Sequence, residues 1–333
     1  MKQFSVLFKI ILSGWLVTAC NSKTESSPYD SIYSLPAIKE ISDSIQRFPD
    51  NDQLYYRRFK ALISLDDKYL DAALYDLNSA WKLKRTLPYA WEFGTTLVLK
   101  NKDSAISFLK NALLLYPNSV ELKETLGNAY ETAGDFDNAL KTFDATIAME
   151  PDNPWYKRKK AGVLDKMGKK AEAIEILKDL FDKGEKFVGE ELAFMLAQSK
   201  DPKTLALCDE MIKTDSAHER AEPHYFKGVY FYNIDNKAKA IEEFDKAIRI
   251  NFNFLDAYLE KGRTLYESKK INEALKVFTL ASAVSPAFAD SYYWIGKCQQ
   301  ALGQDDEAKL NYQRAYGFDK TLTEAKDSAD KIK

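Results

Sequence analysis

Small residues return along the chain at nearly constant intervals, and a larger apolar residue follows most of them at a fixed distance. The small residues are spaced 33, 33, 34, 32, 35, 34 and 34 residues apart, at Ala61, Gly94, Gly127, Ala161, Ala193, Gly228, Gly262 and Gly296. Most of them are followed after twelve residues by a second small residue and after sixteen by a bulky one, such as Phe143 or Phe278. This spacing predicts pairs of amphipathic helices. Its recurrence predicts a chain of similar helical hairpins.

The stretch from Gly127 to Pro151 shows one such hairpin in full. In such a hairpin we expect Gly127 on the first helix to face Ala139 and Phe143 on the second, with Gly134 in the turn between them. Glycine inside a helix costs about 0.5–1 kcal/mol relative to alanine. We therefore expect Gly127 to permit a close approach of two helix backbones.

With this spacing, over roughly residues 35 to 320, the chain resembles the tetratricopeptide repeat (TPR) family. The resemblance implies an all-α fold, a right-handed α-solenoid of about eight TPR helix hairpins with an N-terminal half repeat and a C-terminal capping helix. The solenoid is expected over 35–333, with a capping helix over 321–333 and units at 52–84, 88–116, 119–150, 153–183, 187–214, 221–251, 254–285 and 288–318. The fifth unit has the weakest signature, because Thr204 replaces its second small residue. A hinge or a change of curvature is left open there.

The first residues have the pattern of an export signal. Lys2 precedes an apolar run from Phe4 to Leu16, which is shorter than the roughly 20 residues of a transmembrane helix. The residues from Leu16 to Cys20 resemble the lipobox of bacterial lipoproteins. This resemblance implies a lipoprotein signal peptide over 1–19, lipidation of Cys20, and attachment to the membrane through that lipid. An ordinary cleaved leader is the alternative.

The polar segment that follows, over 20–34, is expected to be a flexible tether. Asn21 follows the cysteine where an aspartate would favour retention at the inner membrane in enterobacterial lipoproteins. We therefore expect an outer-membrane lipoprotein of the cell envelope, facing the periplasm or the cell surface.

The overall charge argues against binding to nucleic acid. Lys and Arg number 48 against 50 Asp and Glu, a formal net charge of −2. Such a balance lacks the basic patch that nucleic-acid binding requires. It also gives no sign of a polybasic membrane anchor.

In TPR proteins the first helices line a concave groove that binds extended peptides or partner helices. The resemblance implies that residues six and three before, and one and four after, each small residue face this groove; Arg58 occupies one such position. Large aromatic residues and arginine are the commonest binding hot spots. We expect the partner-binding groove to be formed by Tyr55, Trp91, Trp155, Arg158, Tyr225, Tyr232, Arg263, Tyr266 and Tyr293. The alternative is that several of these rings pack between neighbouring repeats.

Two charged features of the third unit bear on the partner. Glu121, Glu124 and Glu131 form an acidic face, which could bind a basic segment or simply face solvent. TPR proteins that clamp a C-terminal carboxylate use a lysine three residues before the small residue and an asparagine one after it. Here Asn128 is accompanied by Glu124, so a carboxylate clamp is not expected.

The sequence offers little for catalysis. His218 and His224 are the two histidines, and neither has a cysteine or carboxylate at metal-ligand spacing. His224 is expected to pack or to cap its helix. Cys208 and Cys298 fall at core positions and are read as buried apolar residues. We therefore expect no enzyme activity, no metal and no cofactor.

Together these patterns favour a non-enzymatic scaffold or adaptor, anchored to the bacterial envelope, that binds a protein partner in its groove. The alternative is an envelope module that binds glycan or peptidoglycan, because tyrosine and tryptophan also stack on sugars. Paired exposed rings with flanking carboxylates would favour a sugar. An unbroken apolar groove would favour a peptide.

Overall fold

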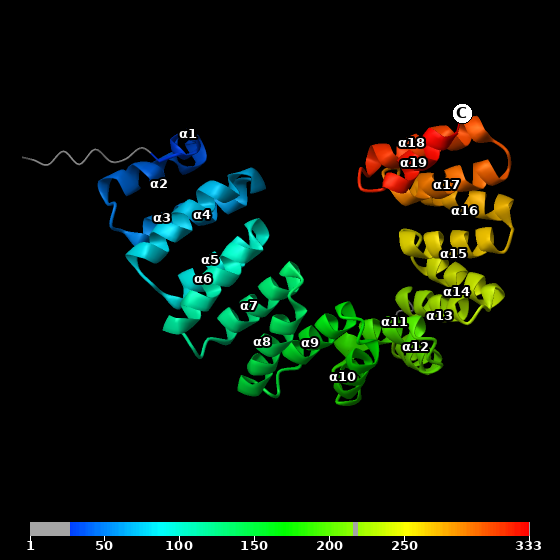
Figure 1. The fold of residues 1–333 in the computed structure, drawn as a ribbon, viewed down its shortest axis with the longest axis horizontal. Helices are drawn as coiled ribbons and strands as arrows, with labels where there is room; N and C mark the ends of the chain where they lie inside the picture. Colours follow the sequence, from blue (N-terminus) through cyan, green and yellow to red (C-terminus); the bar gives the residue numbers. More distant parts are fainter. Residues whose placement is uncertain (1–26, 216–218, 333) are drawn as a thin grey trace, which may run out of the picture. The chain divides into compact units, whose positions relative to one another are not determined.

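The structure, a computed structural model, describes residues 27–215 and 219–332. Within these ranges the chain forms nineteen α-helices and two short 3₁₀-helices, and no strand (Figure 1). The all-α solenoid of stacked hairpins is confirmed. The expected lipidation site, Cys20, lies outside the described residues, as does His218.

The helices form two compact units, which meet in sequence between Lys100 and Asn101. The boundary falls inside the pair predicted over 88–116. Unit 1 contains α1 (Asp30–Tyr33), α2 (Pro36–Arg47), α3 (Asp52–Leu65), η1 (Asp67–Tyr69), α4 (Leu70–Leu83) and α5 (Leu87–Lys100). Its core contains Ile38, Phe59, Leu62 and Leu77.

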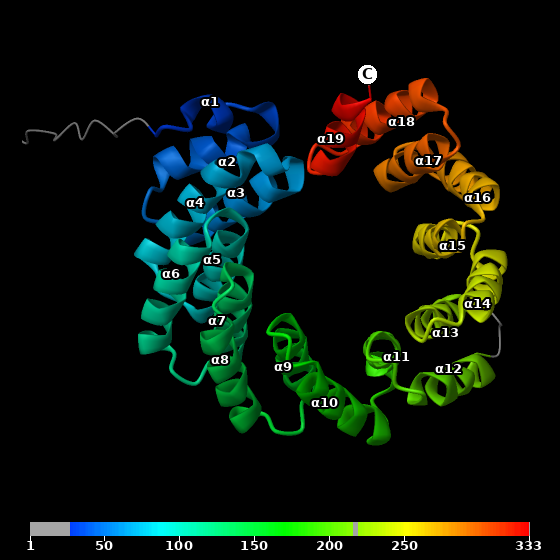
Figure 2. The ribbon, with the colours of Figure 1, turned by 45° about the vertical axis from the view of Figure 1, so that its right-hand side comes forward.

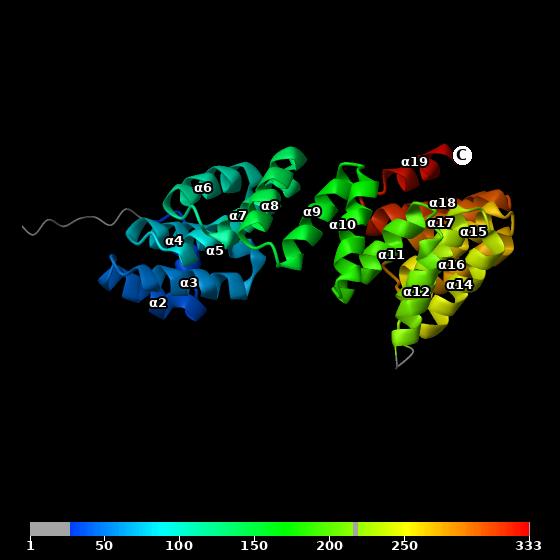
Figure 3. The same ribbon diagram turned by 90° about the horizontal axis from the view of Figure 1, so that it is seen from below.

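Unit 2 contains the remaining helices, and within it each helix from α13 to α18 packs against the next (Figures 1 and 3). Its helices are α6 (Lys102–Leu115), α7 (Val120–Ala133), α8 (Phe136–Met149), α9 (Pro154–Lys166), α10 (Lys170–Asp182), η2 (Lys186–Val188), α11 (Gly189–Gln198), α12 (Lys203–Thr214), α13 (Glu222–Asn233), α14 (Lys237–Ile250), α15 (Leu255–Glu267), α16 (Ile271–Val284), α17 (Ala289–Ala301), α18 (Asp305–Phe318) and α19 (Thr323–Lys331).

Local sequence signals set where these helices begin and end. The Ser119 side chain accepts a hydrogen bond from the backbone N–H of Leu122 at the start of α7. Gly134 ends the same helix with a left-handed φ of 80°. Asp135 then caps α8 by accepting from the backbone N–H of Asn138. Capping oxygens and left-handed glycines satisfy backbone groups that have no partner within the helix.

The glycines of the first helices leave room for a ring from the second helix. A Cβ on Gly228 would lie 2.5 Å from Cδ1 and Cε1 of Phe244, and one on Gly296 would lie 2.8 Å from Cδ1 of Tyr312. The nearest group is a ring from the second helix, and at Gly296 the backbone oxygen of Ala308 also comes within 3.2 Å of the added Cβ. At Gly127 the three nearest atoms all belong to the ring of Phe143.

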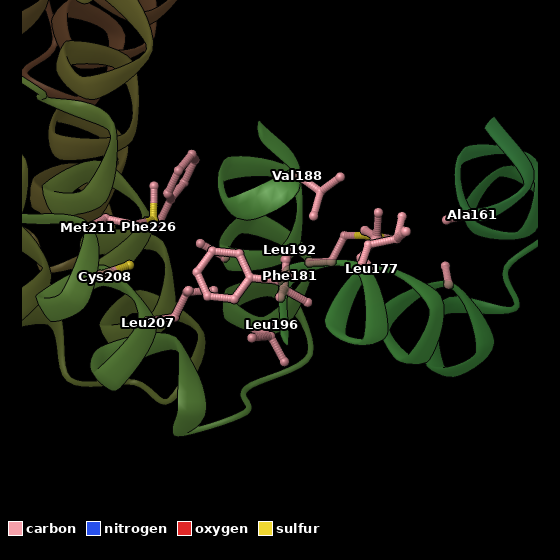
Figure 4. Packing of buried hydrophobic residues seen from close by; sticks show 14 of the residues in the cluster. Ala161, Leu177, Phe181, Val188, Leu192, Leu196, Leu207, Cys208, Met211 and Phe226 are labelled. Carbon is pink, nitrogen blue, oxygen red and sulfur yellow. The ribbon is translucent and has the colours of Figure 1, made fainter. Parts of the chain in front are cut away.

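The fifth unit is well packed in spite of its weak signature. Its first helix, α11, has ten residues and packs against α13 as well as α12. Thr204 and Cys208 are fully buried. Figure 4 shows the surrounding cluster, in which Phe181, Leu192, Leu207 and other buried side chains join α9 through α13.

The two ends of the solenoid are closed by short helices. Residues 30–33, which we expected in the flexible tether over 20–34, instead form α1, and Tyr33 is buried against α4. At the other end α19 buries Ala325, Ala329 and Ile332. These three belong to one apolar stripe, as a capping helix requires.

Candidate protein-binding face

The nine residues expected to form a binding groove all lie on first helices. Tyr55 is on α3 and Trp91 on α5, in unit 1. The other seven are in unit 2, on α9, α13, α15 and α17. In that unit α11, α13, α15 and α17 lie on the inner side of its curve and α12, α14, α16 and α18 on the outer side (Figure 2). None of the nine is fully buried, and Trp91 and Trp155 are 44% and 39% exposed.

Trp155 and Arg158 are held by the helices on either side of α9. The indole Nε1 of Trp155 donates to Oε1 of Glu124 on α7 at 2.8 Å. Nε of Arg158 donates to Oε2 of Glu191 on α11 at 2.8 Å, and its guanidinium lies 5.3 Å from the Trp155 ring. The ring is thus fixed in place while part of it stays exposed.

Four rings and one arginine on α13, α15 and α17 form a second group, which we call the α13–α17 face. It consists of Tyr232, Arg263, Tyr266, Tyr293 and Trp294. The hydroxyl of Tyr232 donates to Oε1 of Glu267 at 2.7 Å, and that of Tyr293 donates to Oε2 of Glu324 at 3.2 Å. Trp294 lies 5.6 Å from the Tyr266 ring and 5.7 Å from the Arg263 guanidinium.

Tyr225 differs from Tyr232 on the same helix, because its contacts are with other rings. Its ring lies 5.0 Å from that of Phe254 and 5.8 Å from that of Phe226. Burial raises the pKa of its hydroxyl. Tyr225 therefore packs between repeats, which is the alternative that we considered for such rings.

Arg58, which the family pattern places at the groove, lies in the core of unit 1. It is 5% exposed and pairs with Asp76 on α4, Nη2 to Oδ1, at 2.7 Å. The expectation that this position faces the groove is wrong for Arg58. Its side chain points into the core because the carboxylate that it pairs with, that of Asp76, is buried there.

Hydrogen bonds between successive first helices recur through both units. In unit 1 the hydroxyl of Tyr56 donates to Glu92, and that of Tyr89 donates to Asp52. In unit 2 the pairs Trp155–Glu124, Tyr232–Glu267 and Tyr293–Glu324 repeat the same combination of an aromatic donor and a carboxylate. Such contacts restrict the side chains before a partner arrives, which lowers the entropy cost of binding.

Carboxylates accompany the rings at regular intervals. Glu222, Asp256, Asp290 and Glu324 stand 34 residues apart, each in the first turn of its helix, which is α13, α15, α17 and the capping helix α19 in turn. No ion pair joins Glu222, Asp256 or Asp290 to another side chain in the described part of the chain. Burial raises the pKa of the Asp290 carboxyl, and the charges of Asp319 and Asp256 raise it further. Burial also raises the pKa of Glu260, although Nη1 of Arg263 donates to it at 2.8 Å.

Our sequence reasoning missed Trp294 and the significance of this carboxylate row. Trp294 lies two residues before Gly296, outside the four positions that we considered. The 34-residue spacing of the carboxylates is visible in the sequence and could have revealed the row.

The acidic face of the third unit is largely engaged within the chain. Glu121 accepts from the Ser119 hydroxyl, Glu124 from Trp155, and Glu131 from Nζ of Lys166. Asn128 Oδ1 is buried and has no hydrogen-bond partner among the described residues. These contacts leave less of the acidic face free for a partner than the sequence suggested.

The described residues contain no group of three or more His, Cys, Asp or Glu side chains that could hold a metal ion. His224, which we expected to pack or to cap a helix, has its Nδ1 2.7 Å from Oε2 of Glu243 on α14.

Cys208 and Cys298 are free thiols and both are buried, as predicted. Of the helices described, none combines the length and the apolar character that a membrane crossing would need.

Comparison with known proteins agrees with this architecture. Sequence models of the tetratricopeptide repeat match residues 100–161 and 132–187, 221–254, and 290–316. A tetratricopeptide repeat protein from Parabacteroides merdae ATCC 43184 has a solved structure that covers 84% of this chain and 97% of its own, with a TM-score of 0.54 at 12% identity. At that identity the likeness concerns the fold.

Curated relatives match shorter stretches. ER membrane protein complex subunit 2 of Xenopus tropicalis is 26% identical over 160 residues, which cover 45% of this chain and 52% of that protein. Hsp70-Hsp90 organizing protein of Triticum aestivum is 23% identical over 204 residues, 59% of this chain and 35% of that protein. The chain thus spans about half, or less, of the length of these relatives.

Proposed function

The chain is a tetratricopeptide repeat protein, a type of protein-interaction scaffold, and we propose that it binds an extended segment of a partner protein on the α13–α17 face. The observation that carries this proposal is the pre-ordered set of rings on that face. Tyr232 and Tyr293 are fixed by carboxylates of the next first helix, yet neither is fully buried. Rigid aromatic side chains supply contact area at a low entropy cost.

The charge beside these rings favours a partner segment that carries lysine or arginine. Glu222, Asp256 and Asp290 form no ion pair among the described residues, and the positive charge of Arg263 acts on Asp290 from a greater distance. A basic segment would supply the missing counter-charges. Each such pair at a surface is worth about 0–1 kcal/mol. Its main effect would be on the selection of the partner and on the rate of association.

Site-specific crosslinking in living cells tests this proposal. A photoreactive phenylalanine derivative in place of Tyr232 should form crosslinks to a partner that mass spectrometry identifies. The same derivative in place of Leu280, which is 57% exposed on the second helix α16, is the matched control. Crosslinks from position 232 and none from position 280 would support the proposal. Equal yields at both positions, or none at position 232, would contradict it.

We further propose that the scaffold is held at the bacterial envelope by lipid on Cys20, on the outer membrane. The sequence from Leu16 to Cys20 supports this assignment. The polar residues that follow would let the helices stand away from the lipid surface. The scaffold would then present its binding face to proteins of the envelope.

A further inference from the structure

Unit 1 contains a cleft that is separate from the α13–α17 face. It lies where α1 and α2 meet α3 and α4, and has a volume of about 520 Å³. Small-molecule sites have volumes of about 300–1,000 Å³. Its lining includes Tyr33, Tyr55, Tyr75, Arg58, Ser42 and Asp43, and we call it the N-terminal cleft.

One wall of the cleft is a rigid polar network. Arg58 donates from Nε and Nη2 to the two carboxylate oxygens of Asp76 at 2.8 and 2.7 Å, and from Nη1 to Oγ of Ser42 at 3.1 Å. The Tyr33 ring lies 3.4 Å from the guanidinium carbon, and its hydroxyl donates to Oδ1 of Asp76 at 3.2 Å. The charge of Arg58 is therefore neutralised before any ligand enters.

Two further tyrosines, Tyr55 and Tyr75, line the same cleft. Tyr75 is 42% exposed, and Tyr55 is partly exposed. Within the described ranges, neither hydroxyl forms a hydrogen bond. The ring of Tyr29 lies 5.6 Å from that of Tyr75 and contacts it in an edge-to-face arrangement. Both phenols can thus donate to and accept from a ligand.

The remaining polar groups show what charge a ligand would meet. Nζ of Lys39 pairs with Asp43 at 3.1 Å, so this cation is also engaged within the chain. Asp30 and Gln46 are exposed at the edge of the cleft, and Asp30 has no ion-pair partner in the described part of the chain. With both cations paired and a carboxylate free, the cleft disfavours an anion. The many hydroxyl, carboxylate and amide groups disfavour a purely apolar ligand.

We infer that the N-terminal cleft binds a neutral saccharide. A sugar has C–H faces that stack on rings such as those of Tyr55 and Tyr75, and hydroxyls that both donate and accept hydrogen bonds. The cleft brings Tyr55 and Tyr75 together with the carboxylates of Asp30 and Asp43, and exposed rings with flanking carboxylates favour a sugar over a peptide. The inference concerns unit 1 alone and does not depend on the partner proposed for the α13–α17 face.

Saturation-transfer NMR on the full-length chain, kept in a detergent without a sugar headgroup, tests this inference. The probes are chitotriose, cellotriose and maltotriose, each offered separately. At least one should bind with a Kd of about 1 mM or tighter. The Tyr75→Ala variant should weaken that binding about tenfold or more, which is about 1.4 kcal/mol. Tyr316→Ala, which removes a ring from α18 in unit 2, should leave the binding unchanged.

A second variant guards against a folding defect. Tyr55→Phe removes a hydroxyl and keeps the ring, so unit 1 should melt as before while the sugar binds more weakly. The inference is overturned if none of the three sugars shows saturation transfer. It is equally overturned if both cleft variants bind as tightly as the unaltered chain.

Discussion

The ring of Phe143 lies against the backbone of Gly127, so that a Cβ added at Gly127 would be 2.8 Å from Cε1 and Cζ of that ring. The same partnership occurs at Gly228 with Phe244 and at Gly296 with Tyr312. Where the bulky residue is Leu77 or Leu177, the small residue is an alanine, Ala61 or Ala161. In these pairs a smaller residue on the first helix is thus matched by a larger residue on the second helix, and we call this the shared volume. In these five pairs glycine accompanies a ring and alanine accompanies leucine, whereas Gly94, which is followed by Leu109, departs from this pattern.

The first prediction follows from this shared volume. Gly127→Ala should lower the free energy of unfolding by about 1–3 kcal/mol, because Phe143 is fully buried and has little room to move. Adding Phe143→Leu should recover part of that loss, since the pair then matches Ala161 with Leu177. A double-mutant cycle in urea measures the coupling. Simple additivity of the two changes would contradict the shared volume.

Gly162 supplies a control at which alanine should change the free energy of unfolding in the opposite direction. It lies within α9, and a Cβ there would have no heavy atom within 4 Å. Gly162→Ala should therefore stabilise the chain by about 0.4–1 kcal/mol, because alanine favours the helix and no neighbour has to move. Thermal unfolding of Gly162→Ala beside Gly127→Ala should show midpoints shifted in opposite directions.

The Arg58–Asp76 pair gives a prediction for unit 1. Both side chains are buried, at 5% and 0% exposure, so removing one charge leaves the other without a partner. Asp76→Ala should destabilise unit 1 by roughly 3–5 kcal/mol. Hydrogen exchange of α2 to α4 measures the effect. The exposed pair Lys39–Asp43 is the control, and Asp43→Ala should change stability by about 1 kcal/mol or less. Equal effects of the two variants would contradict the role of burial.

Lowering the pH should reduce the stability of unit 2, because Glu243 then loses its negative charge. Burial alone would raise the pKa of this carboxyl, but hydrogen bonds with His224 and Lys246 outweigh burial and lower the pKa from 4.5 to about 2. A pKa lowered in the folded state means that the ionised group stabilises the fold above pH 4.5. That contribution is lost as the pH falls from 4.5 through 2.

Thermal unfolding as a function of pH checks this effect. The difference in Tm between the unaltered chain and Glu243→Gln should be largest near neutral pH and should shrink below pH 4.5. Glu242→Gln is the matched control, because the neighbouring carboxylate also contacts Lys246 but is 62% exposed. A difference for Glu243→Gln that stays constant down to pH 2 would rule out the proposed contribution.

The two buried thiols should be unreactive in the folded chain. Burial raises the pKa of Cys208 and of Cys298 to about 12, so little thiolate forms at pH 8. In a Cys20→Ser background, a thiol reagent should modify neither residue until denaturant is added. Ser199→Cys, at an exposed position after α11, should react at once. Rapid modification of the native Cys208 or Cys298 would mean that the helices around it open readily.

The lipid anchor is tested by the same Cys20→Ser change. If lipid on Cys20 holds the chain at the membrane, the variant should appear in the fraction that is soluble without detergent. Metabolic labelling with a fatty-acid analogue should mark the unaltered chain and leave the variant unlabelled. A variant that still requires detergent would argue that something other than Cys20 attaches the chain.

The sequence by itself determined the repeat, the hairpins and the apolar character of Cys208 and Cys298. These properties depend on residue type at fixed spacing, because a 34-residue register places like residues at like positions in every hairpin. The apolar stripe of the capping helix follows from helical periodicity in the same way.

The tertiary structure alone decided which polar and aromatic side chains meet. Arg58 points into the core because Asp76 lies on the facing helix, and Tyr225 lies against the rings of Phe244 on α14 and Phe254 at the N-cap of α15. A ring rather than a backbone fills the space beside Gly127. These outcomes depend on side-chain direction and on partners tens of residues away, which the spacing of residue types along the chain does not specify.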